Sequence, residues 1–256
     1  MSHVIAFNTA NLVARCSGYT FSLGNWMDEH NKTVAKTDEK EFESICHDIA
    51  SAGYSAVELW VAHVDPAGMT DARAANYRSI LRAFGLTAVA LAGTLNDAHA
   101  DVCQKLNIPA CCGGFWGSDR ATVVRLMKST GIAFNYENHP EKSVDDVRKV
   151  VDFGADGIAC AVDTGWFSTQ NVSAPDAIRT LGGLVRHVHL KDVNAFGAHE
   201  TVPLGTGVTD IPACVSALKN IGYTGVLSWE DEPEDRNPMD IATDTRLYIQ
   251  SLWSKQ

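Results

Sequence analysis

Short apolar runs alternate with amphipathic segments eight times along this chain, and this repeat is the feature that most restricts its fold. The apolar runs have the length and composition of strands, at residues 4–8, 56–61, 87–92, 108–113, 132–137, 157–163, 185–190 and 225–230. Helical segments follow them at 38–52, 70–84, 96–106, 119–130, 143–153, 174–182, 210–221 and 239–253. Strands that alternate with helices are parallel. The sequence therefore predicts eight βα units, which leaves about 32 residues per unit when 256 residues are divided among eight.

Eight such units form either a closed barrel or an open, doubly wound sheet. No Gly-x-Gly-x-x-Gly motif follows the first strand, and Gly205-Thr-Gly207 lies late in the chain without a third glycine. A dinucleotide-binding sheet is therefore disfavoured. We predict a single-domain (β/α)8 TIM barrel over residues 1–256.

Residues 9–37 are expected to form a long first βα loop. This segment is rich in aromatic residues, namely Tyr19, Phe21 and Trp26. It is interpreted either as a packed excursion on the surface or as a wall of the substrate pocket, because long loops in compact domains are often functional.

Charge and composition restrict the partners. The formal net charge of −10 disfavours nucleic acids and anionic membrane surfaces, which both bind basic surfaces. No apolar run approaches the roughly 18 residues of a membrane span, and the seven cysteines are scattered and odd in number. We therefore expect a cytoplasmic protein that acts on a small molecule.

Polar side chains end four consecutive predicted strands. Glu137, Asp163, His189 and Glu230 each stand where an apolar run stops. In a barrel the carboxyl ends of the strands meet at one face, where the active sites of this fold lie. Side chains alternate along a strand, so Asp163 shares its orientation with the small residues Ala161 and Ala159, which leaves space for an ion. Three converging carboxylates repel one another unless a cation lies between them, and oxygen-rich ligation with one imidazole favours Mn²⁺, with Mg²⁺ or Co²⁺ as alternatives.

Three motifs resemble a known family: His187-Val-His-Leu-Lys-Asp192, Val162-Asp-Thr-Gly165 and Pro203-Leu-Gly-Thr-Gly207. With the strand of Glu230, they resemble the xylose isomerase-like superfamily of sugar isomerases and epimerases, whose members include ketose 3-epimerases, hydroxypyruvate isomerase and inosose dehydratase. The resemblance implies that Glu137, Asp163, His189 and Glu230 bind the metal. Many relatives have histidine where Trp166 stands here, so the resemblance does not transfer a particular substrate; Trp166 either stacks on a sugar or packs against a loop.

The predicted reaction begins with removal of a proton from the carbon beside a carbonyl, which forms an enediolate. Glu137 and Glu230 are the expected catalytic bases: two bases give epimerisation and one shuttling base gives isomerisation. The same enediolate can instead expel a β-hydroxyl group. A dehydratase or lyase acting on a keto-sugar or keto-inositol is therefore the alternative.

Further residues are predicted to contact the substrate. His139 and His187 share the orientation of Glu137 and His189, although each can instead support a ligand. Lys191 either binds a substrate oxygen or phosphate, or pairs with Asp192. Glu58 at the end of the second strand is a further candidate, and Asn8 and His63 are weaker candidates of the same kind.

Two other functions are compatible with a barrel. An endonuclease for abasic DNA requires several zinc ions and a basic groove, which the acidic charge disfavours. A non-catalytic barrel would bind no stoichiometric metal. A homo-oligomer is compatible with the sequence, but no feature predicts its symmetry.

Overall fold

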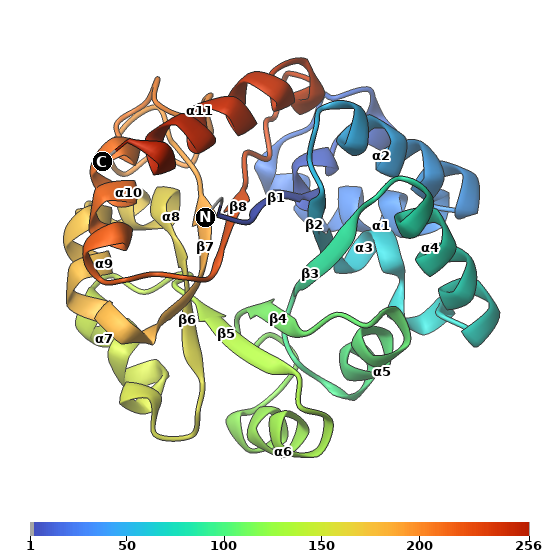
Figure 1. The fold of residues 1–256 in the computed structure, drawn as a ribbon, viewed down its shortest axis with the longest axis horizontal. Coiled ribbons are helices and arrows are strands. Elements are labelled where there is room, and N and C mark those ends of the chain that lie inside the picture. The colour runs from blue at the N-terminus through green and yellow to red at the C-terminus, as the bar shows by residue number, and fades with distance from the viewer. Residues whose placement is uncertain (1–2, 256) are drawn as a thin grey trace.

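The computed structural model describes residues 3–255, and its eight strands close into a parallel barrel in chain order (Figure 1). The fold class predicted from the sequence is confirmed, and each observed strand lies within its predicted range. The strands are β1 Ile5–Asn8, β2 Ala56–Trp60, β3 Thr87–Ala92, β4 Ala110–Gly113, β5 Ala133–Glu137, β6 Ala159–Asp163, β7 Val185–Leu190 and β8 Val226–Trp229.

Helices surround the barrel, as Figure 1 shows. They are α1 Trp26–Lys36, α2 Glu39–Ser51, α3 Val61–Val64, α4 Asp71–Ala83, α5 Asp97–Leu106, α6 Arg120–Thr130, α7 Val144–Val150, α8 Thr164–Thr169, α9 Ala174–Leu181, α10 Ile211–Asn220 and α11 Ala242–Ser254. Ser143 caps α7 and Asp38 caps α2, because their side-chain oxygens accept hydrogen bonds from the amides of Asp146 and Glu41. Gly131 follows α6 with a φ of 75°, a left-handed conformation that glycine adopts without steric cost.

Side chains along each strand point alternately into the barrel and outward toward the helices. Side chains that point outward, such as Phe7, Phe134 and Trp229, join the large core between strands and helices. Ala90, Cys112 and Ala161 form a separate small cluster. Ala161 shares the orientation of Asp163, so small side chains occupy part of the barrel interior below the site. The predicted strand orientation is thus supported by packing.

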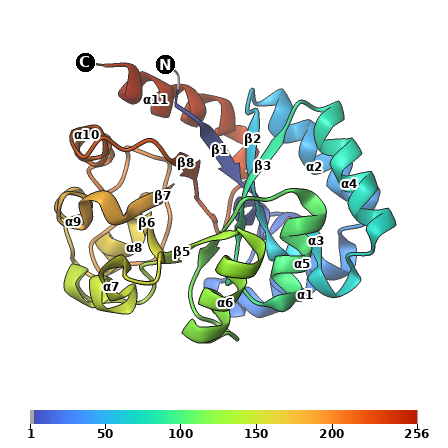
Figure 2. The same ribbon diagram turned by 60° about the horizontal axis from the view of Figure 1, so that its bottom comes forward.

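The segment predicted as a long first loop contains a helix. Residues 9–37 form short 3₁₀ turns and then α1, so the interpretation of this stretch as loop alone was wrong over residues 26–36. In Figure 2, α1 lies at the end of the barrel toward which β1 points. The first helix therefore covers the face where the strand ends converge.

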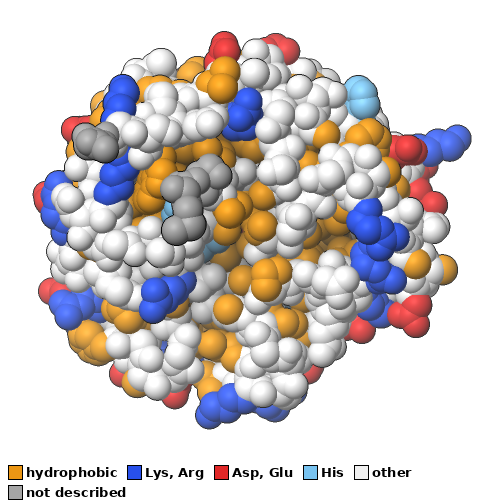
Figure 3. All heavy atoms as spheres, in the orientation of Figure 1, with side chains coloured by type: hydrophobic (Ala, Val, Ile, Leu, Met, Phe, Trp, Pro, Cys, Tyr) orange, Lys and Arg blue, Asp and Glu red, His pale blue; other side chains and the backbone are white. Residues whose placement is uncertain are grey.

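The opposite face, on which the strands begin, is shown in Figure 3. Lys, Arg, Asp and Glu side chains are dispersed around its rim, and hydrophobic side chains lie nearer its centre. Within residues 3–255, no helix combines the length and apolar character of a membrane span.

Candidate active site

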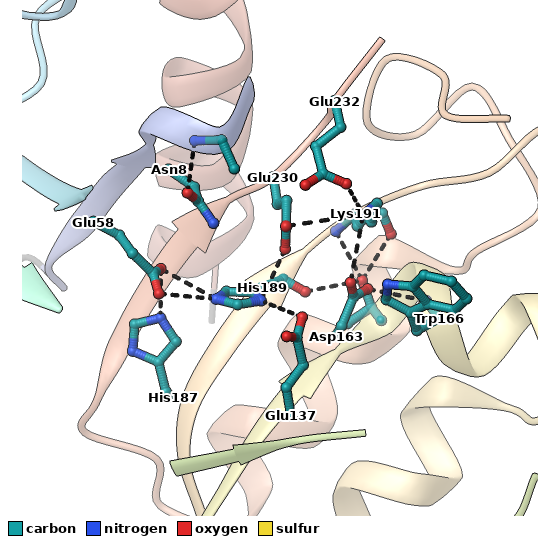
Figure 4. Close-up of polar contacts among 12 residues, drawn as sticks. Asn8, Glu58, Glu137, Asp163, Trp166, His187, His189, Lys191, Glu230 and Glu232 are labelled. Atoms are coloured by element: carbon teal, nitrogen blue, oxygen red, sulfur yellow. Dashed lines mark hydrogen bonds and ion pairs between the residues drawn. The ribbon is translucent and has the colours of Figure 1, made fainter. Parts of the chain in front are cut away.

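Four side chains converge at the carboxyl ends of β5 to β8 (Figure 4). Each can offer one ligand atom, and these atoms lie within 4.8 Å of one another; the residues are Glu137, Asp163, His189 and Glu230. All four side chains are buried. The strand ends therefore bring together the set that the sequence predicted as metal ligands.

His189 lies at the centre of this set, with carboxylates at both ring nitrogens. Its Nδ1 is 3.0 Å from Oε1 of Glu137 and 2.8 Å from Oε2 of Glu230. Its Nε2 is 3.1 Å from both oxygens of Glu58. Glu58 also lies 2.8 Å from Nε2 of His187, so one buried carboxylate contacts both histidines. Nδ1 is the nitrogen that faces the other three candidate ligands.

The carboxylates hold the His189 ring in its charged form. Burial opposes a charge on the ring, but Glu230, Glu58 and Glu137 outweigh this effect and raise the pKa of His189 well above 6.5. Burial likewise opposes the charged form of Glu58, yet His187 and His189 lower its pKa well below 4.5. A positive charge at the position of this ring therefore stabilises the surrounding carboxylates.

Asp163 retains a free acceptor inside the site. Its Oδ1 accepts a hydrogen bond of 3.0 Å from the Trp166 amide, whereas its buried Oδ2 has no hydrogen-bond partner. Burial raises the pKa of Asp163 to about 7, and the charges of Glu230 and Glu137 act in the same direction. A buried acceptor without a donor requires an explanation. A cation bound among these oxygens provides one, so the donor set fits a divalent metal ion.

Side-chain hydrogen bonds to the backbone fix the strand ends that carry the site. Asn138 accepts from the Asp163 amide at 2.7 Å and donates to the Asp163 carbonyl at 3.1 Å. Asn11 accepts from the Asp231 amide at 2.7 Å and donates to the Trp229 carbonyl at 3.1 Å, on either side of Glu230. These contacts restrict the backbone on which two of the candidate ligands stand.

Lys191 forms an ion pair beside the four residues. Its Nζ is 2.6 Å from Glu232 and 3.7 Å from Oδ2 of Asp163. The alkyl part of Lys191 packs on Gly165, where an added Cβ would lie 2.7 Å from its Cγ. The alternative pairing with Asp192 is not what the structure shows, because Asp192 instead accepts hydrogen bonds from backbone amides that include Gly205 and Gly207, each at 2.9 Å.

The remaining predicted site residues divide into two groups. His139 and Trp166 line a cavity of about 700 Å³ above the four residues. A second group is buried and does not line this cavity: Glu58, His187, Asn8 and His63. His63 lies 3.1 Å from the hydroxyl of Thr9, and Asn8 accepts a hydrogen bond of 3.0 Å from Ala10.

Several cavity residues were not predicted. Glu232 lines it with a φ of 35°, an uncommon backbone conformation that clusters at functional sites. Trp60 and Trp116 also line it. Trp26 of α1 lines the cavity too, and it belongs to the 9–37 segment for which a pocket wall was one of the two interpretations. Trp60 ends β2 and Trp116 follows β4, so position after a strand was a usable signal for these two.

Known proteins share this architecture. An L-ribulose 3-epimerase from Mesorhizobium japonicum is 24% identical over 174 residues, which is 64% of this chain and 54% of that enzyme; the match thus spans about half of the relative's length. A solved structure of L-ribulose 3-epimerase has a TM-score of 0.70 and 19% identity, covering 98% of this chain and 94% of that chain.

A probable 3-DHS dehydratase from Bacillus anthracis has a TM-score of 0.67 at 11% identity, with 99% of both chains covered. At such identities these structures share the fold. The family model described as xylose isomerase-like TIM barrel matches residues 118–252. Because this match spans more than half of the chain and includes the four converging residues, the protein belongs to the xylose isomerase-like TIM barrel family.

Proposed function

We propose that the protein is a sugar epimerase or isomerase that depends on a divalent metal ion and acts through an enediolate. The observation that carries this proposal is the convergence of three carboxylates and one imidazole within 4.8 Å, with Oδ2 of Asp163 buried and unpartnered. The similarity to L-ribulose 3-epimerase supports the reaction class.

Four residues would hold the ion: Glu137, Asp163, His189 and Glu230. A bound ion supplies a Lewis acid that polarises the substrate carbonyl. Three oxygen ligands with one nitrogen ligand suit Mn²⁺ best, with Mg²⁺ and Co²⁺ as the ions to compare.

The chain itself supplies the proton transfers. Glu137 and Glu230 reach the site from β5 and from the end of β8, so they approach a bound substrate from different sides. One carboxylate removes the proton beside the carbonyl, and the other returns a proton to the opposite face, which inverts that carbon. If one carboxylate performs both transfers between neighbouring carbons, the product is an aldose.

Solvent exchange tests this proposal directly. The metal-free protein is reloaded with Mn²⁺ and incubated in D₂O with L-ribulose and other ketopentoses and ketohexoses. We expect deuterium in the sugar only when metal is present: at C3 for an epimerase, and at C1 or C2 for an isomerase. Absence of exchange in every ketose with the loaded protein contradicts the proposal.

A dehydratase is the second function that the same carboxylates support, since an enediolate beside a β-hydroxyl group can eliminate water. Its conjugated product absorbs in the ultraviolet, whereas an epimerised or isomerised sugar does not. Absorbance recorded during the same incubations therefore separates the two reactions.

We also propose that the enzyme is located in the cytoplasm. All seven cysteines lie within residues 3–255 and are free, which supports a reducing, cytoplasmic compartment.

A further inference from the structure

The cavity above the four converging residues is larger than the metal-binding end requires. It has a volume of about 700 Å³, and Glu137, His189 and Glu230 form part of its lining. Pockets of roughly 300–1,000 Å³ typically enclose drug-sized molecules. The remaining lining therefore carries information about the part of the substrate that lies away from the reacting carbon.

One wall of this cavity is aromatic and comes from the first two βα units. Trp26 and His30 of α1 pack against Trp60 at the end of β2, with ring centroids 5.3 Å apart in both pairs. All three residues line the cavity. This first aromatic wall includes part of the segment that the sequence left open between packing and substrate contact.

A second aromatic wall comes from the units of β4 to β6. The His139 ring lies 3.6 Å from the Trp166 ring and 5.5 Å from the Trp116 ring, measured between centroids. In a closed barrel of eight strands in chain order, β6 lies across from β2. The two walls therefore approach the cavity from different sides, an arrangement that suits a flat apolar group between them.

Two side chains at this cavity are apolar and exposed. The exposed fraction is 63% for Met27 and 52% for Trp116, and both line the cavity. Exposed apolar side chains that gather at one opening are typical of a ligand-binding groove. A bare sugar bound at the four converging residues does not account for apolar side chains at the exposed end.

The charged side chains that line the cavity disfavour an anionic group away from the four converging residues. No Lys or Arg belongs to its lining as the structure describes it, whereas Glu137, Glu230 and Glu232 do. Lys191 lies next to it, but its ammonium group is held by Glu232 at 2.6 Å. Away from the four converging residues, a phosphate group would thus meet Glu232 without a free Lys or Arg side chain to pair with it.

We propose that the substrate is an uncharged carbonyl sugar that bears an aromatic or similarly flat apolar group, with this group lying between the two aromatic walls. This inference rests on the proposed function for the sugar end and extends it to the opposite end of the cavity. The carboxylates in the lining indicate a substrate without phosphate. The two aromatic walls, together with the exposed apolar side chains at the opening, indicate the apolar group.

Matched glycosides test the apolar group. Methyl and phenyl pyranosides of glucose, galactose and xylose are titrated into the Mn²⁺-loaded protein, with tryptophan fluorescence or calorimetry as the readout. Burial of a phenyl ring predicts that at least one phenyl compound binds about tenfold or more tightly than its methyl partner. Equal affinities in all pairs overturn the inference.

Two variants locate the effect. Trp116→Ala is expected to weaken binding of the phenyl compound more than binding of its methyl partner, and so to remove most of the phenyl preference. Phe153→Ala is the matched control, because Phe153 is an exposed aromatic residue before β6, at the other end of the barrel. A phenyl preference that survives Trp116→Ala at full size overturns the placement of the group between the walls.

A second comparison tests the charge. D-Fructose 6-phosphate is expected to compete more weakly than D-fructose for the sugar site of the Mn²⁺-loaded protein. Tighter binding of D-fructose 6-phosphate overturns the proposal that the substrate is uncharged. The outcomes also separate the two proposals. Metal-dependent deuterium exchange in free ketoses without any phenyl preference overturns the substrate class alone. A phenyl preference in a protein that shows no exchange with any ketose overturns the proposed function alone.

Discussion

Both carboxylate oxygens of Glu58 lie 3.1 Å from Nε2 of His189, on the side of the ring away from Glu137 and Glu230. Histidines that bind metals generally donate their second N–H to a carboxylate or carbonyl, which fixes both the tautomer and the direction of the ring. Glu58 is fully buried on β2, so it holds this orientation from across the barrel. It is a positioning residue for the proposed metal ligand.

Replacement of Glu58 by glutamine should therefore weaken metal binding. Glu58→Gln retains the size of the side chain but removes the negative charge that His189 faces. We expect the affinity for Mn²⁺ to fall by about 10- to 100-fold. Competition with a fluorescent chelator measures this change. Ser228→Ala is the control, because the buried Ser228 hydroxyl has no hydrogen-bond partner and Ser228 shares the orientation of Glu230. Wild-type affinity in Glu58→Gln contradicts the positioning role.

The barrel and the converging residues were predictable because both depend on local periodicity. The small residues Ala159 and Ala161 below Asp163 indicated its orientation in the sequence alone. A glycine directly after a helical segment, such as Gly131 after α6, is a further local signal because glycine readily adopts the left-handed conformation seen there. These features follow from neighbouring residues and require no knowledge of which strands meet.

Contacts between distant segments were not predictable in this way. Asn11 fixes the backbone beside Glu230 although about 220 residues separate them, and no spacing rule connects the two. Lys191 pairs with Glu232 rather than with its neighbour Asp192, because the amides of the 193–209 segment occupy Asp192. The helix within residues 9–37 was missed because its polar sequence resembles a loop.

Each of the two proposed catalytic carboxylates should be required for turnover. Glu137→Gln and Glu230→Gln each remove a group that accepts a proton, and we expect each to lower turnover by at least ~10²-fold. Deuterium exchange in a reactive ketose measures the effect under saturating metal, which separates lost catalysis from lost metal binding. Glu43→Gln on the exposed face of α2 is the matched control. Unchanged turnover in either active-site variant removes the assigned role.

Metal binding should release protons. A metal ligand must bind through an unprotonated nitrogen, whereas Glu230, Glu58 and Glu137 outweigh burial and raise the pKa of His189. Asp163, whose pKa is raised to about 7, adds to the release. We expect at least about one proton per ion near pH 7, and an affinity for Mn²⁺ that increases with pH. Calorimetry in buffers of different ionisation enthalpy measures the number; a binding heat that does not depend on the buffer contradicts it.

His63 should make the stability of the fold depend on pH. Burial lowers its pKa from 6.5 to about 3, with smaller contributions from the positive charges of Arg15 and His30. Between these values the unfolded chain binds a proton that the folded protein excludes, so the free energy of unfolding falls as the pH decreases below 6.5. This residue alone is expected to remove about 2 kcal/mol of stability between pH 6.5 and pH 5.

The His63→Gln variant isolates this effect because glutamine retains a polar group for Thr9 but does not titrate. Urea unfolding with a metal chelator present should show the wild type losing more stability than His63→Gln as the pH falls from 7.5 to 5. His47→Gln, a change at an exposed histidine of α2, should follow the wild-type curve. Parallel curves for the wild type and His63→Gln would mean that the folded protein admits the proton, and that the interior around Thr9 opens to water below pH 6.5.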